Sequence, residues 1–89
     1  MKRIYVTISG KVQKVFFRTF VNRNAILLKL TGYIKNLIDG SVEAVFEGDH
    51  ENLIQIIEIC KKGPVNAIVE NIQIKEGEYS AEFKEFSIV

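Results

Sequence analysis

The chain has 89 residues, of which 47% are hydrophobic and 26% are charged, with a single cysteine. This length suits one domain, residues 1–89, and the composition is typical of a soluble globular protein rather than a disordered one. No apolar run approaches the roughly 20 residues of a membrane helix, and the basic N-terminus lacks the apolar stretch of a signal peptide. One cysteine excludes an internal disulfide. We therefore expect a cytoplasmic protein with no membrane partner.

Basic side chains are concentrated in the first part of the chain. Residues 1–38 contain eight Lys or Arg and no acid, whereas residues 39–89 contain four Lys or Arg and eleven Asp or Glu. This asymmetry indicates an anionic ligand near the N-terminal elements. The alternative is that the two parts interleave in space, so that their charges mix.

The first third of the chain predicts a strand, a loop and a helix. Residues 2–9 alternate between polar and apolar side chains, as in a half-buried strand. A loop over residues 10–17 follows. Residues 18–30 have the apolar spacing of a helix, with Val21, Ala25 and Leu28 on its buried stripe.

A hairpin and a second helix are predicted next. Residues 31–38 and 41–47 have the pattern of two strands, joined by Asp39-Gly40, a two-residue signal for a type I′ turn. Asp49 is the expected N-cap of a helix over residues 50–62. A Gly-Pro pair then ends this helix.

The last part of the chain predicts two more strands. Residues 65–75 form the fourth strand, with Ile68, Ile72 and Ile74 facing the core. Residues 83–89 form a final strand at an edge of the sheet.

This order of elements, β-α-β-β-α-β, is typical of an α+β ferredoxin-like sandwich, with two helices packed on one face of an antiparallel sheet. In that topology the first two strands run parallel, with the third between them. Their C-terminal ends share one end of the sheet. Asn36, near the end of the second strand, should therefore approach the loop and Arg18.

The loop that follows the first strand indicates an anion site. Backbone N–H groups beside a helix N-terminus attract anions, and Arg18 adds a planar cation there. No histidine, no serine with a base, no carboxylate pair and no metal-ligand cluster accompanies the loop. The single histidine, His50, is interpreted as an exposed first-turn residue, and Cys60 as a small core residue.

Phosphoryl transfer to water suits a site with so few catalytic side chains, because this reaction depends on positioning and charge stabilisation. A carboxylate leaving group, whose conjugate acid has a pKa of about 4, needs no general acid. Backbone donors and Arg18 would hold the phosphate oxygens, and the Asn36 amide could orient a water through its donor and acceptor atoms. This chemistry points to acyl phosphates, the mixed anhydrides of carboxylic and phosphoric acids.

The residue pattern supports the same conclusion. Residues 10–18 read Gly-Lys-Val-Gln-Lys-Val-Phe-Phe-Arg. Further along, the pattern continues with Ala25, then Gly32, Tyr33, Ile34 and Asn36, then Asp39, Gly40 and Val42, and finally Gly63 and Pro64. In this spacing the chain resembles the acylphosphatase family over essentially its whole length.

The resemblance implies a cytoplasmic hydrolase that cleaves acyl phosphates to carboxylate and inorganic phosphate without a cofactor or a metal. By motif position, Arg18 binds the phosphate and Asn36 positions the attacking water. The phosphate-binding loop would consist of Lys11, Val12, Gln13, Lys14, Val15, Phe16 and Phe17. The expected partners are a small acyl phosphate and inorganic phosphate, without nucleic acid or membrane, and we expect a monomer.

Two lysines depart from the family pattern. Lys14 and Lys29 stand where the pattern has glycine, one in the loop and one near the end of the first helix. A lysine would adopt a glycine-like positive φ only at a cost of about 1 kcal/mol. The alternative function is thus a catalytically weakened acylphosphatase-like domain that binds phosphate or another protein, and the first helix is expected to end differently.

An RNA-binding module of the same topology is a rival hypothesis. Ile4-Tyr5-Val6 resembles the first-strand motif of such modules, and the basic N-terminal part would suit RNA. The third strand, however, lacks the basic and aromatic residues that stack on bases. Glu43 and Glu47 are expected to share a face with Tyr5, where they would repel phosphate.

Overall fold

The computed structural model describes residues 1–89 as two helices packed against a five-stranded sheet. The elements are β1 (Lys2–Lys11), α1 (Phe17–Leu27), β2 (Thr31–Asn36), β3 (Val42–Gly48), α2 (His50–Lys62), β4 (Ile68–Gly77) and β5 (Phe86–Ile88). The predicted order of elements is confirmed. Neither helix has the length and apolar character needed to span a bilayer.

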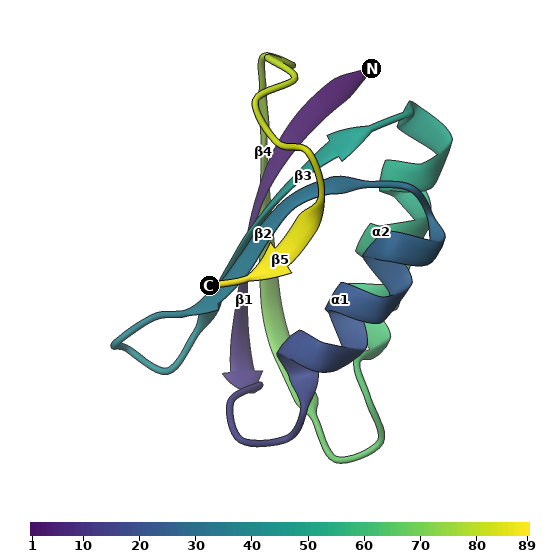
Figure 1. The fold of residues 1–89 in the computed structure, drawn as a ribbon. Helices are drawn as coiled ribbons and strands as arrows, with labels where there is room; N and C mark the ends of the chain where they lie inside the picture. Colours follow the sequence, from purple (N-terminus) through teal and green to yellow (C-terminus); the bar gives the residue numbers. More distant parts are fainter.

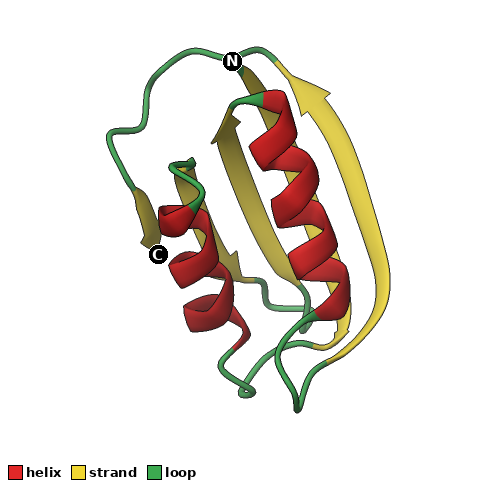
Figure 2. Cartoon of the chain, turned by 90° about the vertical axis from the view of Figure 1, so that its right-hand side faces the viewer, coloured by secondary structure: helices red, strands yellow, loops and turns green.

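The sheet has the strand order β4-β1-β3-β2-β5, and both helices cover one of its faces (Figures 1 and 2). β3 pairs antiparallel with β1 and with β2, so these two strands run parallel, as predicted. β5 pairs parallel with β2, which makes the sheet mixed rather than wholly antiparallel. The reason is that β4 ends beside the start of β1, so a strand entering from that end must run in the direction of β2. With this correction, the fold is the predicted ferredoxin-like sandwich.

One core joins the helices to the covered face of the sheet. Val21 and Ala25 of α1 are fully buried, as predicted, whereas Leu28 is the C-cap of the helix and is only partly buried. On α2 the buried stripe consists of Leu53, Ile56 and Cys60. Since both stripes face the sheet, the N-terminus of α1 is fixed beside the end of β1.

Gly32 of β2 lies where the backbone of β3 comes very close. It pairs with Phe46 on one side and with Phe86 on the other. These two phenyl rings stack with centroids 5.2 Å apart. Gly32 has φ +136°, and a Cβ there would lie 1.8 Å from the carbonyl oxygen of Val45. A side chain at this position would thus disturb the pairing of β2 with β3.

The loop between β1 and α1 is shorter than predicted. β1 continues to Lys11, which pairs with Ile68, because a register shift after Ser9 lets pairing with β4 resume. α1 begins at Phe17 rather than at residue 18. The connection therefore consists of residues 12–16, with Lys11 and Phe17 at its two ends.

Because of the same register shift, the prediction that Ile68, Ile72 and Ile74 of β4 all face the core is wrong. Ser9 pairs with Asn71 and Gly10 with Val69, so one residue of β4 is skipped and the alternation of its side chains changes there. Ile68 is consequently 59% exposed instead of inward. Ile72 packs against the core, but Ile74 is 43% exposed because β4 lies at the edge of the sheet.

The hairpin between β2 and β3 is not the predicted two-residue type I′ turn. A type I′ turn needs positive φ at both central residues, whereas Gly40 has φ +94° and Asp39 has a negative φ. The connection spans residues 37–41, closed by a 2.8 Å hydrogen bond from the Leu37 N–H to the Ser41 carbonyl oxygen. The longer turn presents the carbonyl oxygens of Leu37 and Ser41 to the side chain of Gln13, which lies between β1 and α1.

The predictions for the ends of the helices are confirmed at the start of α2 but not at the end of α1. Asp49 is the N-cap of α2, as predicted, although its side chain accepts no capping hydrogen bond. Lys29 has φ +58°, and the N–H groups of Lys29 and Leu30 donate to the carbonyls of Ile26 and Ala25. This is a Schellman motif, in which glycine is usual at the position of Lys29. The expectation that α1 would end differently is therefore wrong.

Candidate active site

In the β1–α1 loop, residues with positive φ alternate with a residue of negative φ. Lys14 has φ +61° and Phe16 has φ +60°, whereas Val15 between them has a negative φ. Successive residues of alternating hand direct their N–H groups into a shared concavity that binds anions. Lys14 therefore adopts the conformation for which glycine is preferred, despite its side chain.

The backbone N–H groups of this segment have no protein acceptor. Outside the regular elements, the first backbone–backbone hydrogen bond donated after β1 comes from the Phe20 N–H, which reaches the Phe16 carbonyl oxygen at 3.0 Å. The N–H groups of residues 13–19 donate to no backbone or side-chain group. The first turn of α1 also contains no acidic residue and no capping side chain. An anion beside this helix end would meet unused donors and the positive end of the helix dipole.

A pocket of about 360 Å³ opens beside the loop. Its lining consists of Val12, Lys14, Phe16, Phe17, Arg18, Thr19, Asn36 and Ile88. Arg18 and Asn36 thus share one pocket, although they lie on α1 and β2. The topology explains this arrangement, because β1 and β2 both end at this side of the sheet (Figure 1).

Asn36, one of the residues that line the pocket, has an unused acceptor in its side chain. Its Oδ1 atom is buried and accepts no hydrogen bond from the protein. A buried carbonyl oxygen without a donor is unfavourable, and a bound water or ligand would relieve this. The amide therefore retains the acceptor that a water would need.

The pocket is also rich in unpaired positive charge. Arg18 and Lys14 take part in none of the ion pairs of the protein, and no carboxylate lines the pocket. Two cations without a counter-charge favour the binding of an anion. A phosphate group, with its spread of negative oxygens, suits such a site.

Three of the predicted loop residues lie outside the lining. Gln13 instead donates from Nε2 to the carbonyl oxygens of Leu37 and Ser41, at 2.8 and 2.9 Å, and so ties the loop to the β2–β3 hairpin. Lys11 is exposed on β1, and Val15 packs partly against the core. The side chain of Gln13 therefore shapes the loop from behind.

Sequence reasoning missed two lining residues, Thr19 and Ile88. Thr19 directly follows Arg18, and the first turn of a helix beside an anion site could have suggested it. Ile88 lies on β5, and its position depends on the parallel pairing of β5 with β2, which the sequence pattern did not reveal.

Metal-ligating side chains form no group of three or more anywhere in the structure. The chemistry available to the pocket thus comes from Arg18, Lys14, the Asn36 amide, the Thr19 hydroxyl and backbone N–H groups. These groups can bind an oxyanion, stabilise charge on it and orient a water.

Comparison with known proteins places the chain in a family. A sequence profile described as Acylphosphatase matches residues 4–88. The chain is 43% identical to an acylphosphatase of Syntrophus aciditrophicus over 89 residues, covering 100% of this chain and 93% of the relative. It is 44% identical to an acylphosphatase of Pelotomaculum thermopropionicum over 86 residues, covering 97% and 94%.

Solved structures agree with the sequence comparison. The crystal structure of acylphosphatase from Bacillus subtilis superimposes with a TM-score of 0.96 at 36% identity, covering 100% of this chain and 99% of that one. The chain therefore belongs to the acylphosphatase family. The predicted family, fold and enzyme class are confirmed.

Proposed function

We propose that the chain hydrolyses acyl phosphates to a carboxylate and inorganic phosphate in the pocket beside the β1–α1 loop. One observation carries this proposal: the unpaired Arg18, loop residues whose backbone N–H groups are free, and Asn36 with its unused acceptor line the same pocket. The names of the relatives in the family point to the same substrate class.

In the proposed reaction the phosphoryl group lies in the loop, and its oxygens accept hydrogen bonds from backbone N–H groups and Arg18. These donors stabilise the negative charge that is spread over the oxygens in the transition state. The bidentate guanidinium also fixes the orientation of the phosphoryl group. Lys14 adds a second positive charge near the same oxygens.

Asn36 is the proposed water-positioning residue. Its Oδ1 accepts a hydrogen bond from the attacking water and directs the water oxygen at phosphorus, opposite the leaving carboxylate. The new bond joins the water oxygen to phosphorus, and the bond between phosphorus and the carboxyl oxygen breaks with its electron pair on the carboxylate. One water proton passes to a phosphate oxygen, so the products are a carboxylate and dihydrogen phosphate. Because a carboxylate leaves readily, no general acid is required.

We further propose that the reaction needs neither a metal nor a cofactor and that the enzyme acts in the cytoplasm as a monomer of one domain. Arg18 and the loop donors would carry the charge stabilisation that a metal ion supplies in other phosphoryl-transfer sites. The lone Cys60, buried on α2, is compatible with a reducing compartment.

Hydrolysis of benzoyl phosphate by the purified chain tests this proposal. We expect release of benzoate well above the rate in buffer, competitive inhibition by inorganic phosphate, and the same rate with and without EDTA. A rate equal to that in buffer would contradict the enzyme. If phosphate still bound to such an inactive chain, the anion-binding alternative would replace it.

A further inference from the structure

Two apolar side chains of the pocket are left in solvent. Val12 and Phe17 are each 1% exposed and belong to the core, but Phe16 is 82% exposed and Ile88 is 41% exposed. Single exposed apolar residues are common on protein surfaces. These two differ because both border the pocket that contains Arg18 and Asn36.

The backbone at Phe16 is strained. A bulky residue with φ +60° is rare, and such a conformation costs on the order of 1 kcal/mol or more. Core packing does not compensate for this cost, since the ring is mostly in solvent. Phe16 also borders an adjacent hollow of about 280 Å³, so its ring stands between two depressions. Strain of this kind is concentrated at ligand sites, where it holds a group in place before binding.

Ile88 is held firmly in position. It pairs with Ile34 of β2, and the next residue, Val89, donates from its N–H to the Ile34 carbonyl oxygen at 3.0 Å. The stacked Phe46 and Phe86 fix the other end of β5. The Ile88 side chain therefore forms a fixed part of the pocket rather than a mobile end of the chain.

We propose that Phe16 and Ile88 form an apolar wall that binds the acyl part of the substrate, so that the enzyme prefers acyl phosphates with an aromatic or bulky apolar acyl group. This inference rests on the proposed function. With the phosphoryl group bound by the loop and Arg18, the acyl group would cover apolar surface at the wall and remove it from water. A volume of about 360 Å³ is at the small end of ligand pockets, which suits a phosphoryl group with one ring.

The ratio of kcat/KM for benzoyl phosphate to that for acetyl phosphate tests the wall. We expect this ratio to fall about tenfold in Phe16→Ala and severalfold in Ile88→Ala, because lost apolar contacts discriminate between substrates by this amount. Phe16→Tyr, which keeps the ring, should retain the ratio. Leu27→Ala is the matched control, since Leu27 is 78% exposed on α1 but lies outside the pocket. The inhibition constant of inorganic phosphate should stay unchanged in Leu27→Ala, and in Phe16→Ala and Ile88→Ala it should change much less than the ratio of the two substrates.

The outcomes separate the wall from the underlying activity. If the native chain hydrolysed neither substrate, the proposed function itself would be overturned. If it hydrolysed both and Phe16→Ala left their ratio unchanged, the wall alone would be wrong. A native preference for succinyl phosphate over benzoyl phosphate would also contradict the wall, because the free carboxylate would then be bound by a cation such as Lys14.

Discussion

Two arginines at opposite ends of the sheet have opposite surroundings. Arg3, at the start of β1, is 8% exposed, and each of its three guanidinium nitrogens donates a hydrogen bond. Arg18, in the pocket beyond the end of β1, has no side-chain partner in the protein. About ten residues of strand, roughly 30 Å, separate the two regions.

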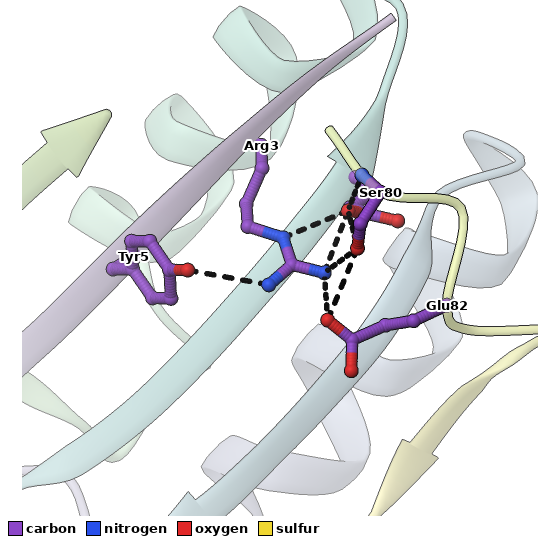
Figure 3. A network of polar contacts seen from close by, with 5 residues as sticks. Arg3, Tyr5, Ser80 and Glu82 are labelled. Carbon is purple, nitrogen blue, oxygen red and sulfur yellow. Dashed lines mark hydrogen bonds and ion pairs between the residues drawn. The ribbon is translucent and has the colours of Figure 1, made fainter. Parts of the chain in front are cut away.

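The Arg3 cluster consists of Arg3, Tyr5, Glu47, Ser80 and Glu82 (Figure 3). Nε of Arg3 donates to Oε2 of the buried Glu47 at 2.7 Å, and the other nitrogens donate to Tyr5, Ser80 and Glu82. The Ser80 N–H reaches the same Glu47 oxygen at 3.0 Å. The cluster thereby ties the connection between β4 and β5 to the sheet. Its arginine is fully used in holding the fold, so no capacity is left for a ligand.

The contrast explains the uneven charge of the sequence. Three ion pairs join a base from residues 1–38 to an acid from residues 39–89: Arg3 with Glu47 and with Glu82, and Lys35 with Glu43. At these ion pairs the charges of the two parts of the chain do mix. Around Arg18 and Lys14 they do not. The proposed binding site is therefore marked by cations that have no acidic partner, rather than by the net charge of a segment.

The largest expected effect is that of Arg18→Ala. Loss of the guanidinium should lower kcat/KM for benzoyl phosphate about a thousandfold, because the charge on the phosphoryl oxygens is no longer stabilised. The free energy of unfolding should change by less than about 0.5 kcal/mol, since Arg18 has no partner to lose. Arg23→Ala, a similar change on the same helix, is the control and should keep its activity. An Arg18→Ala chain of native activity would remove the contrast between the arginines.

Arg3→Ala should have the converse effect. Removal of Arg3 leaves the carboxylate of Glu47, which is 1% exposed, without its cation, and we expect the free energy of unfolding to fall by about 3 kcal/mol. Urea titration measures this change. Replacing both partners, Arg3→Met with Glu47→Leu, should recover part of the loss. Phosphate inhibition should remain native in whatever fraction is folded; a weakened inhibition would show that the two regions are coupled.

Asn36→Ala should separate binding from turnover within the pocket. Without Oδ1 to orient the water, kcat should fall about a hundredfold, whereas the inhibition constant of phosphate should change less than twofold. Steady-state kinetics with phosphate as inhibitor provides both numbers. Equal loss of turnover and of phosphate affinity would contradict the water-positioning role.

Lys14→Gly and Lys29→Gly compare two lysines with the same backbone strain. Both have φ near +60°, so glycine should raise the free energy of unfolding by about 1 kcal/mol at either position. Only Lys14 lines the pocket, so only Lys14→Gly should also weaken phosphate binding, by about threefold, a value typical of an exposed charge. If both variants bound phosphate equally well, the Lys14 ammonium would have no part in the site.

The smallest effect concerns pH. Hydrogen bonds from Arg3 and then Ser80 hold the pKa of Glu82 below its ordinary value, and the Ser41 hydroxyl and N–H do the same for Asp39 in the connection between β2 and β3. A carboxylate whose pKa is lower in the folded state stabilises the fold at neutral pH, and this contribution is lost as the pH falls below about 4. Urea midpoints of Glu82→Gln and Asp39→Asn should therefore depend less on acid than that of the native chain. Parallel curves for all three would contradict these assignments.

The local sequence pattern and the topology predicted most of the fold and the meeting of Arg18 with Asn36. They did not predict features that depend on pairing between distant strands. The alternation in β1 and the stripes on α1 and α2 gave the elements, and the split topology brought Asn36 to the side of Arg18. The extra residue opposite Ser9 and the direction of β5 depend on pairing between distant strands, so Ile68 was misplaced and Ile88 was missed. The positive φ at Lys14 and Lys29 became evident only in the structure, because tertiary contacts override a local preference against it.

Titration of the ¹⁵N-labelled chain with inorganic phosphate, followed by the chemical shifts of its amides, tests the central claim most directly. The account predicts that the largest shifts occur at the backbone N–H groups of residues 13–19 and at the Asn36 side chain, while Arg3 and Glu47 stay unchanged. Saturable shifts centred on the Arg3 cluster, or no saturable shifts in the loop, would contradict it.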